Sequence, residues 1–241
     1  MARKSSSRLI VALDFDRLAH AVSMARRLVG VVAMFKVGSQ LFTAEGPRAV
    51  ERLSRLGPGI FLDLKFHDIP NTVAGAVAAA AQLPGVKLVN VHALGGVEMM
   101  RAARQVLGHS PRRPKLLAVT VLTSLDAAAL RRVGIQGSPA VRAIALARLA
   151  KSCGLDGVVA SPKEAALIRL ACGENFLIVV PGVRPRASGK QDQARVATPA
   201  EAIRAGADYV VIGRPITGAR NPRAAAGAIA AEITRALGLR V

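Results

Sequence analysis

Short runs of hydrophobic, largely β-branched residues recur along the chain and alternate with longer segments rich in alanine and arginine. Short apolar runs bounded by turn residues are typical of strands that are buried on both faces. Eight runs are predicted to form strands: Leu9–Phe15, Val32–Gly38, Ile60–Phe66, Leu88–Ala93, Leu116–Leu122, Gly157–Ala160, Ile178–Val183 and Tyr209–Gly213. The clearest intervening segments are predicted to form helices: Asn71–Leu83, Val97–Leu107, Ala140–Ser152 and Pro222–Leu237. Because a strand and a helical segment alternate eight times, the pattern predicts a parallel sheet.

The number of repeats and the chain length predict that this sheet closes on itself. Eight strand–helix units in 241 residues match a (β/α)8 TIM barrel. An open doubly wound sheet is the alternative, and it is disfavoured because no G-x-G-x-x-G motif follows the first strand. No linker-like segment divides the chain, so residues 1–241 are expected to form a single barrel domain. With 51% hydrophobic but only 3% aromatic residues, the core is expected to consist mainly of Ala, Val, Leu and Ile.

The sequence carries neither a membrane-segment pattern nor a disulfide framework. The apolar stretch Leu9–Leu13 ends at Asp14 and is too short for a secretion signal. No segment approaches the roughly 20 apolar residues that span a bilayer. The two cysteines, Cys153 and Cys172, lack metal-ligand spacing and are expected to be buried free thiols. These features predict a protein of the reducing cytoplasm with no membrane partner.

The chain is strongly basic, with a formal net charge of +19. Such a charge is compatible with a nucleic-acid partner or an anionic small molecule. The basic residues are spread over the whole chain, however, and few aromatic side chains exist to stack on bases. Most of them, including Arg101, Arg104, Arg142 and Arg148, are therefore interpreted as solvated helix faces, and no nucleic-acid partner is expected.

The third predicted strand carries charges that a packed core would exclude. Side chains alternate along a strand, so Asp63 and Lys65 share one face while Leu62, Leu64 and Phe66 take the other. The apolar face is expected to pack against the helices. Asp63 and Lys65 are then left inside the mouth of the barrel, at the strand ends where active sites of this fold lie.

Two neighbouring strands are expected to add charges to the same mouth. Asp14 ends the first strand and Lys36 lies near the end of the second. Unit charges 4 Å apart interact by about 4 kcal/mol at an effective dielectric of 20, so alternating lysines and aspartates can remain ionised together. A structural ion-pair network without chemistry is the alternative interpretation.

The segment after the third strand, Asp68–Thr72, combines a further acid with an expected helix start. Pro70 fixes the turn, and Asn71 or Thr72 is predicted to cap the following helix. This capping role does not account for Asp68, which lies just beyond the strand.

The ends of the seventh and eighth strands carry matching glycine–arginine turns, at Gly182–Arg184 and Gly213–Arg214. The loops after these two strands form the usual phosphate site of the fold. Glycine lets backbone N–H groups approach an anion, and arginine adds a two-pronged donor. The polar stretch Arg184–Arg195 is expected to be a loop that closes over a ligand, with Gln193 bonding to the phosphate or base. A plain turn or a solvated loop is the alternative for each feature.

With these motifs in view, the sequence resembles the orotidine 5′-monophosphate decarboxylase family. The most specific match is the run Phe61–Thr72, which reads FLDLKFHDIPNT. Further matching blocks follow the family's order over nearly the whole chain: Ala12–Asp14, Phe35–Gly38, Glu45–Pro47, Val89–Ala93, Val119–Ser124, Pro181–Arg184 and Val211–Arg214.

The resemblance implies a reaction and a set of catalytic residues. The reaction is decarboxylation of orotidine 5′-monophosphate to uridine 5′-monophosphate, the last step of de novo pyrimidine biosynthesis, without a metal or organic cofactor. Lys65 is implied as the proton donor to C6, and Asp63 lies beside the substrate carboxylate. Lys36 and Asp68 complete an alternating charged array. In this family the second aspartate comes from the partner of a homodimer, so Asp68 is expected to serve the neighbouring site.

The resemblance also implies the residues that bind the substrate. Asp14 and Lys36 hold the ribose hydroxyls, and Thr72 reaches the ribose across the dimer interface. Thr123 contacts the pyrimidine. The base and phosphate are bound by Arg184, Gln193, Gly213 and Arg214. Of the nearby histidines, His92 is expected to form a hydrogen bond in the barrel mouth and His67 to support the turn after the third strand.

Two other classes of protein compete with this hypothesis. Hexulose-phosphate synthases and ketogulonate-phosphate decarboxylases resemble the same barrel and share Asp-x-Lys-x-x-Asp, but they use Mg²⁺. The flanking His67, Ile69–Thr72 and Val119–Ser124 favour the orotidylate branch. A basic nucleic-acid binder would explain the charge but leaves the buried aspartate and lysine pattern without a role.

Overall fold

Eight parallel strands form a closed barrel in the computed structural model, which describes residues 8–185 and 197–238. The strands are β1 (Leu9–Ala12), β2 (Met34–Gly38), β3 (Gly59–Phe66), β4 (Val86–His92), β5 (Lys115–Val119), β6 (Gly157–Val159), β7 (Leu177–Pro181) and β8 (Tyr209–Ile212). Each strand pairs with its neighbours in sequence order, and β8 pairs with β1 to close the ring. The prediction of a (β/α)8 barrel is therefore confirmed.

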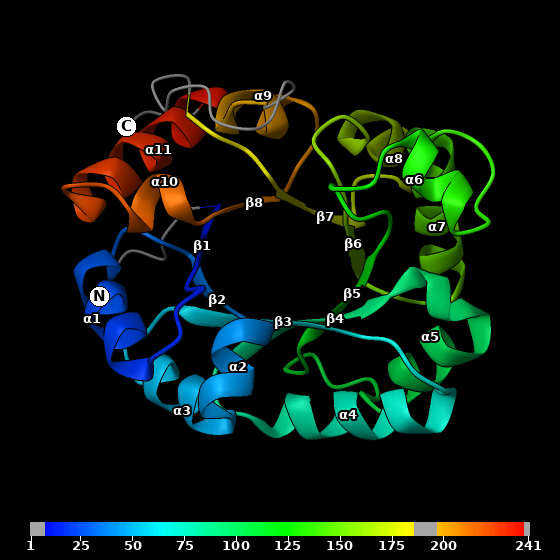
Figure 1. Cartoon of the computed structure of the whole chain (residues 1–241), viewed down its shortest axis with the longest axis horizontal. Coiled ribbons are helices and arrows are strands. Elements are labelled where there is room, and N and C mark those ends of the chain that lie inside the picture. Colours follow the sequence, from blue (N-terminus) through cyan, green and yellow to red (C-terminus); the bar gives the residue numbers. More distant parts are fainter. Residues whose placement is uncertain (1–7, 186–196, 239–241) are drawn as a thin grey trace.

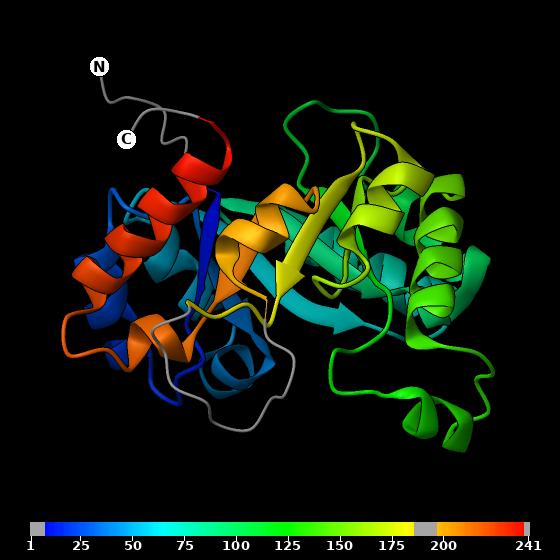
Figure 2. The same ribbon diagram turned by 90° about the horizontal axis from the view of Figure 1, so that it is seen from above.

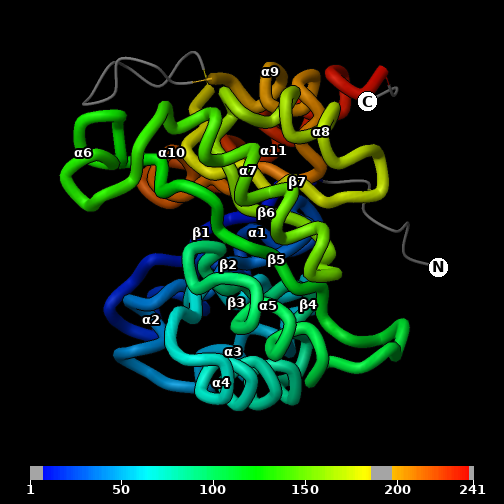
Figure 3. Tube along the Cα trace, turned by 90° about the vertical axis from the view of Figure 1, so that its right-hand side faces the viewer, coloured from blue at the N-terminus to red at the C-terminus, as the bar shows by residue number. Residues whose placement is uncertain are grey.

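Helices surround this ring, as the view along the barrel shows (Figure 1). They are α1 (Leu18–Leu28), α2 (Ser39–Glu45), α3 (Pro47–Ser54), α4 (Pro70–Gln82), the 3-10 turn η1 (Ala93–Gly95), α5 (Gly96–Gln105), α6 (Ala127–Arg132), α7 (Pro139–Ser152), α8 (Ala165–Cys172), α9 (Pro199–Arg204), α10 (Arg214–Thr217) and α11 (Pro222–Ala236). The short helices α2, α6 and α10 lie at the end of the barrel to which the strands point (Figure 2). Seen from another side, α6 projects further beyond this end of the barrel than α2 and α10 do (Figure 3). These three short helices therefore border the mouth where the sequence predicts the site.

All eight predicted strands exist, but several end earlier than predicted. The first ends at Ala12 rather than Phe15, and the fifth ends at Val119 rather than Leu122. Pairing continues for a single bond beyond each end, from Leu13 N to the Lys36 carbonyl and from Thr120 N to the Val159 carbonyl. Beyond that bond the backbone leaves the ladder, because at this end the chain must turn outward and form the loops of the mouth.

The start of α4 differs from the predicted cap. The helix begins at Pro70, and Ile69 occupies the N-cap position without a side-chain cap. Proline fits the first helical position because its fixed φ suits the helix and its missing N–H is not needed there. The prediction that Asn71 or Thr72 caps this helix is therefore wrong, and both side chains lie exposed in its first turn.

Two apolar layers hold the barrel together, one inside the ring and one between the ring and the helices. The inner layer is built from small and branched side chains with two larger ones, Met34 and Phe61. The outer layer is larger and contains both cysteines, which are buried free thiols as predicted. Alternate residues of each strand feed the two layers, so a polar residue at an inward position is placed directly in the barrel interior.

Only some of the arginines that were predicted to lie on solvated helix faces are exposed. Arg101 and Arg148 are exposed, whereas Arg104 and Arg142 are half-buried. Arg104 donates to the carbonyls of Gly154 and Gly108, and Arg142 donates to the carbonyl of Gln136. The two half-buried arginines thus connect loops, because carbonyls that lie beyond helix ends need donors.

Over the described ranges, no helix is both long and apolar enough to cross a membrane.

Candidate active site

The charged side chains of β3 continue the inward row of the barrel. Phe61 belongs to the inner apolar layer, and Asp63, two residues on, is only 7% exposed. Leu64 and Phe66 pack against the outer layer instead. The predicted alternation is therefore confirmed, and it places the carboxylate of Asp63 at the top of the barrel interior.

Two lysines and two aspartates form a continuous ion-pair chain across β1, β2 and β3. Lys36 Nζ lies 2.9 Å from Asp14 Oδ1 and 3.4 Å from Asp63 Oδ2. Lys65 Nζ lies 2.7 Å from Asp63 Oδ1. A Cβ at Gly38 would fall 2.7 Å from Lys36 Nζ and 3.1 Å from Asp14 Oδ1, so glycine leaves the space in which this pair meets. The predicted array of Asp14, Lys36, Asp63 and Lys65 thus exists within one chain.

The surroundings of Asp63 hold its carboxylate in the ionised form. Burial by itself raises the pKa of Asp63, but the charges of Lys36 and Lys65 and hydrogen bonds from Lys65 and Asn90 outweigh burial, so the pKa lies below its ordinary value. A depressed folded-state pKa adds stability above the unfolded pKa, and this stability is lost as the pH falls through the folded value. At neutral pH the carboxylate of Asp63 is therefore ionised.

Asn90 on β4 belongs to this site, although the sequence analysis assigned it no role. Its Nδ2 donates to Asp63 Oδ1 at 2.7 Å, and its Oδ1 accepts from the backbone N of Lys65 at 2.8 Å. The residue is completely buried. A signal existed in the sequence, because Asn90 lies two residues after the inward-facing Leu88 and is polar where the row should be apolar.

A cavity of about 240 Å³ opens above the array. Its walls include Lys36, Asp63, Lys65 and Thr123, together with apolar side chains of β3, β5, β6, β7 and β8. Thr123 is exposed and lies in the segment that follows β5. The structure thus brings this predicted residue to the charged array, in a hollow of mixed polar and apolar lining that is typical of small-molecule sites.

The glycine–arginine turns lie beyond β7 and β8, which are neighbouring strands. Gly182 has a φ of +74°, a conformation that favours glycine. Arg184 is half-buried, and its backbone N donates to the Ala197 carbonyl at 3.1 Å. Gly213 is the N-cap of α10 and Arg214, its first residue, is exposed. The structure therefore places both turns at the same end of the barrel, whereas Gln193 lies outside the described residues.

Two predicted residues do not join the array of their own chain. Asp68 and Thr72 are exposed just after β3 and at the start of α4. Asp68 Oδ1 accepts a hydrogen bond from Ile69 N at 2.6 Å. Within the part of the chain that the structure describes, Asp68 forms no ion pair. Its carboxylate is therefore available to a group outside this barrel.

Two stacked histidines lie beside Lys65. The rings of His67 and His92 are 5.3 Å apart with an interplanar angle of 19°. His92 Nδ1 accepts from Leu94 N at 3.3 Å, which agrees with the predicted hydrogen bond in the barrel mouth. Burial, followed by the charges of His67 and Lys65, lowers the pKa of His92 below its ordinary value. His92 is therefore neutral at pH 7, with Nδ1 as the acceptor.

This environment predicts a pH-dependent contribution of His92 to stability. Its folded pKa is depressed, so protonating it costs more in the folded than in the unfolded chain, and wild type loses stability as the pH falls below about 6.5. His92→Asn keeps an acceptor for Leu94 N but cannot titrate. The free energy of unfolding of wild type minus that of the variant should decrease between pH 8 and pH 5, measured by urea denaturation. A pH-independent difference would contradict this assignment.

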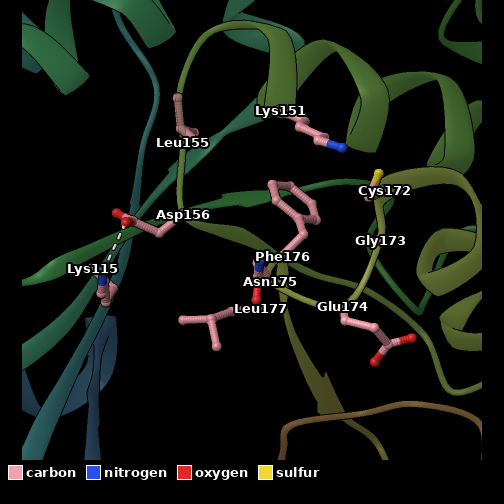
Figure 4. A pocket seen from close by; sticks show the side chains of 10 residues that line it. All are labelled: Lys115, Lys151, Leu155, Asp156, Cys172, Gly173, Glu174, Asn175, Phe176 and Leu177. Carbon is pink, nitrogen blue, oxygen red and sulfur yellow. Dashed lines mark hydrogen bonds and ion pairs between the residues drawn. The ribbon is translucent and has the colours of Figure 1, made fainter.

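A larger hollow lies elsewhere, at the N-terminal ends of β5, β6 and β7. It has a volume of about 580 Å³ and is lined by residues such as Lys115, Lys151 and Phe176 (Figure 4). One of the two acids in its wall, Asp156, is bound by Arg113 at 2.6 Å and by Lys115 at 3.1 Å. These charges are already paired with one another, and active sites of this fold lie at the opposite end.

Fold and site together define a class of protein: a (β/α)8-barrel enzyme with a lysine–aspartate array and glycine–arginine turns at its strand ends. The model of the orotidine 5′-phosphate decarboxylase / HUMPS family matches residues 7–229, and the chain belongs to this family.

Several similar proteins carry the same name. A protein from Anaeromyxobacter sp. (strain K) is 55% identical over 95% of this chain and all of its own length, and one from Nitrosococcus oceani is 51% identical over 95% of this chain and 98% of its own. Both are named orotidine 5′-phosphate decarboxylase. A crystal structure of orotidine 5′-phosphate decarboxylase from Lactobacillus acidophilus superimposes with a TM-score of 0.83 at 39% identity, covering 95% of this chain and 99% of that one.

Proposed function

We propose that this protein decarboxylates orotidine 5′-monophosphate to uridine 5′-monophosphate, the last step of de novo pyrimidine biosynthesis. The observation that carries the proposal is the ion-pair chain Lys36–Asp63–Lys65 at the top of the barrel interior, with the cavity above it. Fixed charges of this kind stabilise a carbanion that the pyrimidine ring itself delocalises poorly. The relatives named above are consistent with the same reaction.

Lys65 is the group that acts on C6. The bond between C6 and the carboxylate breaks, carbon dioxide leaves, and the electron pair stays on C6. The ammonium of Lys65 stabilises this charge and then transfers a proton from Nζ to C6, after which the neutral amine regains a proton from solvent. With its side chain 37% exposed, Lys65 is accessible both to a ligand in the cavity and to solvent.

Asp63 orients Lys65 and opposes the substrate carboxylate. Its Oδ1 accepts from Lys65 Nζ at 2.7 Å, which fixes the direction of the ammonium. Because Asp63 stays ionised, a substrate carboxylate placed beside it is repelled, and this repulsion is relieved as carbon dioxide leaves. Lys36, only 12% exposed and bonded to both Asp14 and Asp63, keeps the array from carrying excess negative charge.

The remaining residues bind the substrate. Asp14 and Lys36 hold the ribose hydroxyls, and Thr123 contacts the pyrimidine from the wall of the cavity. The phosphate and base are assigned to the residues beyond β7 and β8: Arg184, Gln193, Gly213 and Arg214. This assignment is supported by the position of the two turns after neighbouring strands. The net charge of +19 also favours an anionic substrate.

The working form is proposed to be a homodimer in which Asp68 and Thr72 of each chain reach the site of the other. Both residues are exposed, and Asp68 is not paired by the described residues of its own chain. A second carboxylate from the partner would complete the alternation of lysines and aspartates on the far side of Lys65. The buried free thiols of Cys153 and Cys172 fit the proposed location in the cytoplasm.

The reaction is proposed to proceed without a metal ion, in contrast to the Mg²⁺-dependent sugar-phosphate enzymes that resemble this barrel. Magnesium is held by carboxylate oxygens and waters. Both oxygens of Asp63 already face lysine ammonium groups, at 2.7 Å and 3.4 Å. These two positive charges disfavour a divalent cation at the same carboxylate.

A chelator distinguishes the two mechanisms. Purified protein dialysed against EDTA is expected to consume orotidine 5′-monophosphate at the rate of the untreated protein, followed by the loss of ultraviolet absorbance. The control adds Mg²⁺ back after dialysis and is expected to change nothing. Loss of turnover with EDTA and its return with Mg²⁺ would instead contradict the metal-free mechanism.

A further inference from the structure

The hydrogen-bond ladder between β3 and β4 is interrupted at the segment that carries Asp63 and Lys65. Leu62 is opposite Val89, but the next paired residues are Phe66 and Val91. The segment Asp63–Lys65 on β3 is therefore matched by a single residue, Asn90, on β4. Such a bulge leaves backbone groups without their usual partners and redirects the side chains beside it.

The side chain of Asn90 supplies an acceptor for one backbone group of this interrupted segment and a donor for the Asp63 carboxylate. Its Oδ1 accepts from Lys65 N at 2.8 Å, and its Nδ2 donates to Asp63 Oδ1 at 2.7 Å. A backbone N–H only donates and a carboxylate only accepts, so these partners determine which way the amide faces. The side chain is completely buried and is therefore held in one orientation.

The backbone of Lys65 has a conformation that side chains other than glycine rarely adopt. Its φ is +52°, and among the residues that the structure describes it is the only non-glycine residue with a positive φ. A Cβ disfavours this region, so the surroundings must hold the residue there. The bond from Lys65 N to Asn90 is a contact at the strained residue itself.

We infer that Asn90 is a positioning residue of the decarboxylase reaction. One amide fixes both the carboxylate of Asp63 and the strained backbone of Lys65, and so sets the direction of Lys65 Nζ, which bonds to the same Asp63 oxygen. Asn90 acts through these two residues and not on the substrate. This inference rests on the proposed function, because the direction of Lys65 matters only if Lys65 acts on C6.

Asparagine is suited to this position because the position needs both a donor and an acceptor. Aspartate has the same shape, but it loses the donor and brings a second carboxylate against Asp63 at the distance of a hydrogen bond. Leucine offers neither group, so Lys65 N would lose this acceptor and Asp63 would lose one of its donors. Serine is too short to bridge both partners. The chemistry of the amide, rather than its volume, is therefore what the site uses.

The test compares wild type with Asn90→Ala, using Thr120→Val as the matched control. Thr120 is also completely buried and bonds to the Val159 carbonyl, and the hydrogen bonds and ion pairs of Asp63 and Lys65 go to other residues. Asn90→Ala is expected to lower kcat by roughly 10²-fold while KM and the affinity for uridine 5′-monophosphate change less than about threefold. Affinity for the 6-hydroxy analogue of that nucleotide, whose anionic oxygen replaces the carbanion, should fall together with kcat. Thr120→Val should keep kcat within about threefold of wild type.

A pH profile adds a readout that a purely structural role would not change. Asn90 donates to the ionised form of Asp63, so losing this bond raises the pKa of Asp63. The acid limb of kcat/KM should therefore move to higher pH in Asn90→Ala but not in Thr120→Val. If Asn90→Ala does not fold, Asn90→Ser, which leaves room for a bridging water, is measured in the same way.

The outcomes separate this inference from the function on which it rests. A folded Asn90 variant with the kcat and pH profile of wild type would overturn the inference while leaving the decarboxylase function intact. A loss that lowers the affinity for uridine 5′-monophosphate as strongly as kcat would also overturn it, since that pattern indicates general damage to the site. Absence of turnover in wild type itself would defeat the proposed function and this inference with it.

Discussion

Lys65→Ala is expected to lower kcat by roughly 10⁵-fold. The variant loses the ammonium that stabilises the carbanion, which is worth about 10²–10³-fold, and also the acid that protonates C6, worth about 10²–10⁴-fold. The rest of the array should remain in place. Asp63 keeps Lys36 at 3.4 Å and the Asn90 amide at 2.7 Å, so the carboxylate stays paired. The measurement is single-turnover conversion of orotidine 5′-monophosphate, followed by chromatography.

The control for this prediction is the same substitution at the opposite end of the barrel. Lys151 is exposed there and lines the hollow between the N-terminal strand ends (Figure 4). Lys151→Ala should retain kcat, and Lys65→Ala should bind uridine 5′-monophosphate within about tenfold of wild type, because the product lacks the group on which Lys65 acts. A Lys65→Ala variant that keeps a tenth of wild-type kcat would remove Lys65 from the centre of the mechanism.

Asp68→Ala is expected to lower kcat by about 10³-fold, although Asp68 forms no ion pair with the described residues of its own chain. In the proposed dimer its carboxylate stands beside Lys65 of the partner subunit and completes the fixed charge distribution of that site. The substitution removes one charge from each site of the dimer. Because Asp68 is exposed within one chain, its loss should leave the stability of the barrel nearly unchanged.

Mixing the two inactive variants tests the shared site directly. In a heterodimer of Lys65→Ala and Asp68→Ala chains, one site contains both intact residues and the other contains neither. A random mixture should therefore recover about a quarter of the wild-type sites, since half of the dimers are heterodimers with one complete site each. The chains are coexpressed with different tags, and the heterodimer is purified before the assay. A purified heterodimer without activity would show that Asp68 does not serve the neighbouring site.

The sequence predicts most of the single-chain array because alternation along a strand is a local property. Asp63 and Lys65 are two residues apart, so their common face follows from the pleat. The position of Lys36 follows from the parallel neighbourhood of successive strands. The structure confirms these predictions and extends them with distances, as in the 2.7 Å contact between Lys65 and Asp63.

The conformation of Lys65 could not be predicted in this way. The bulge opposite Asn90 depends on how β3 and β4 align across about 25 residues of sequence. The residue pattern along a single strand contains no information on this register shift, which depends on how two strands pair. The early ends of β1 and β5 also depend on tertiary structure. Residues beyond the ladder form the loops of the mouth, whatever their own strand propensity.

The positions of Asp68 and Thr72 illustrate a second limit. Asp68 and Thr72 are exposed in the folded monomer. A role for them in another subunit's site requires contacts between chains, which patterns within one chain do not predict. The resemblance to the family supplied that expectation, whereas alternation and burial could not. Gln193 likewise remains a prediction, since it lies outside the described residues.

The proposed reaction replaces the C6 carboxylate of orotidine 5′-monophosphate by a proton without the help of a metal ion. The most direct measurement incubates the wild-type protein with this nucleotide in D₂O containing EDTA and follows the product by proton NMR. The expected product is uridine 5′-monophosphate that carries deuterium at C6 and retains hydrogen at C5, with one equivalent of carbon dioxide released. No product from folded protein, or product that forms only after Mg²⁺ is added in excess of EDTA, would contradict it.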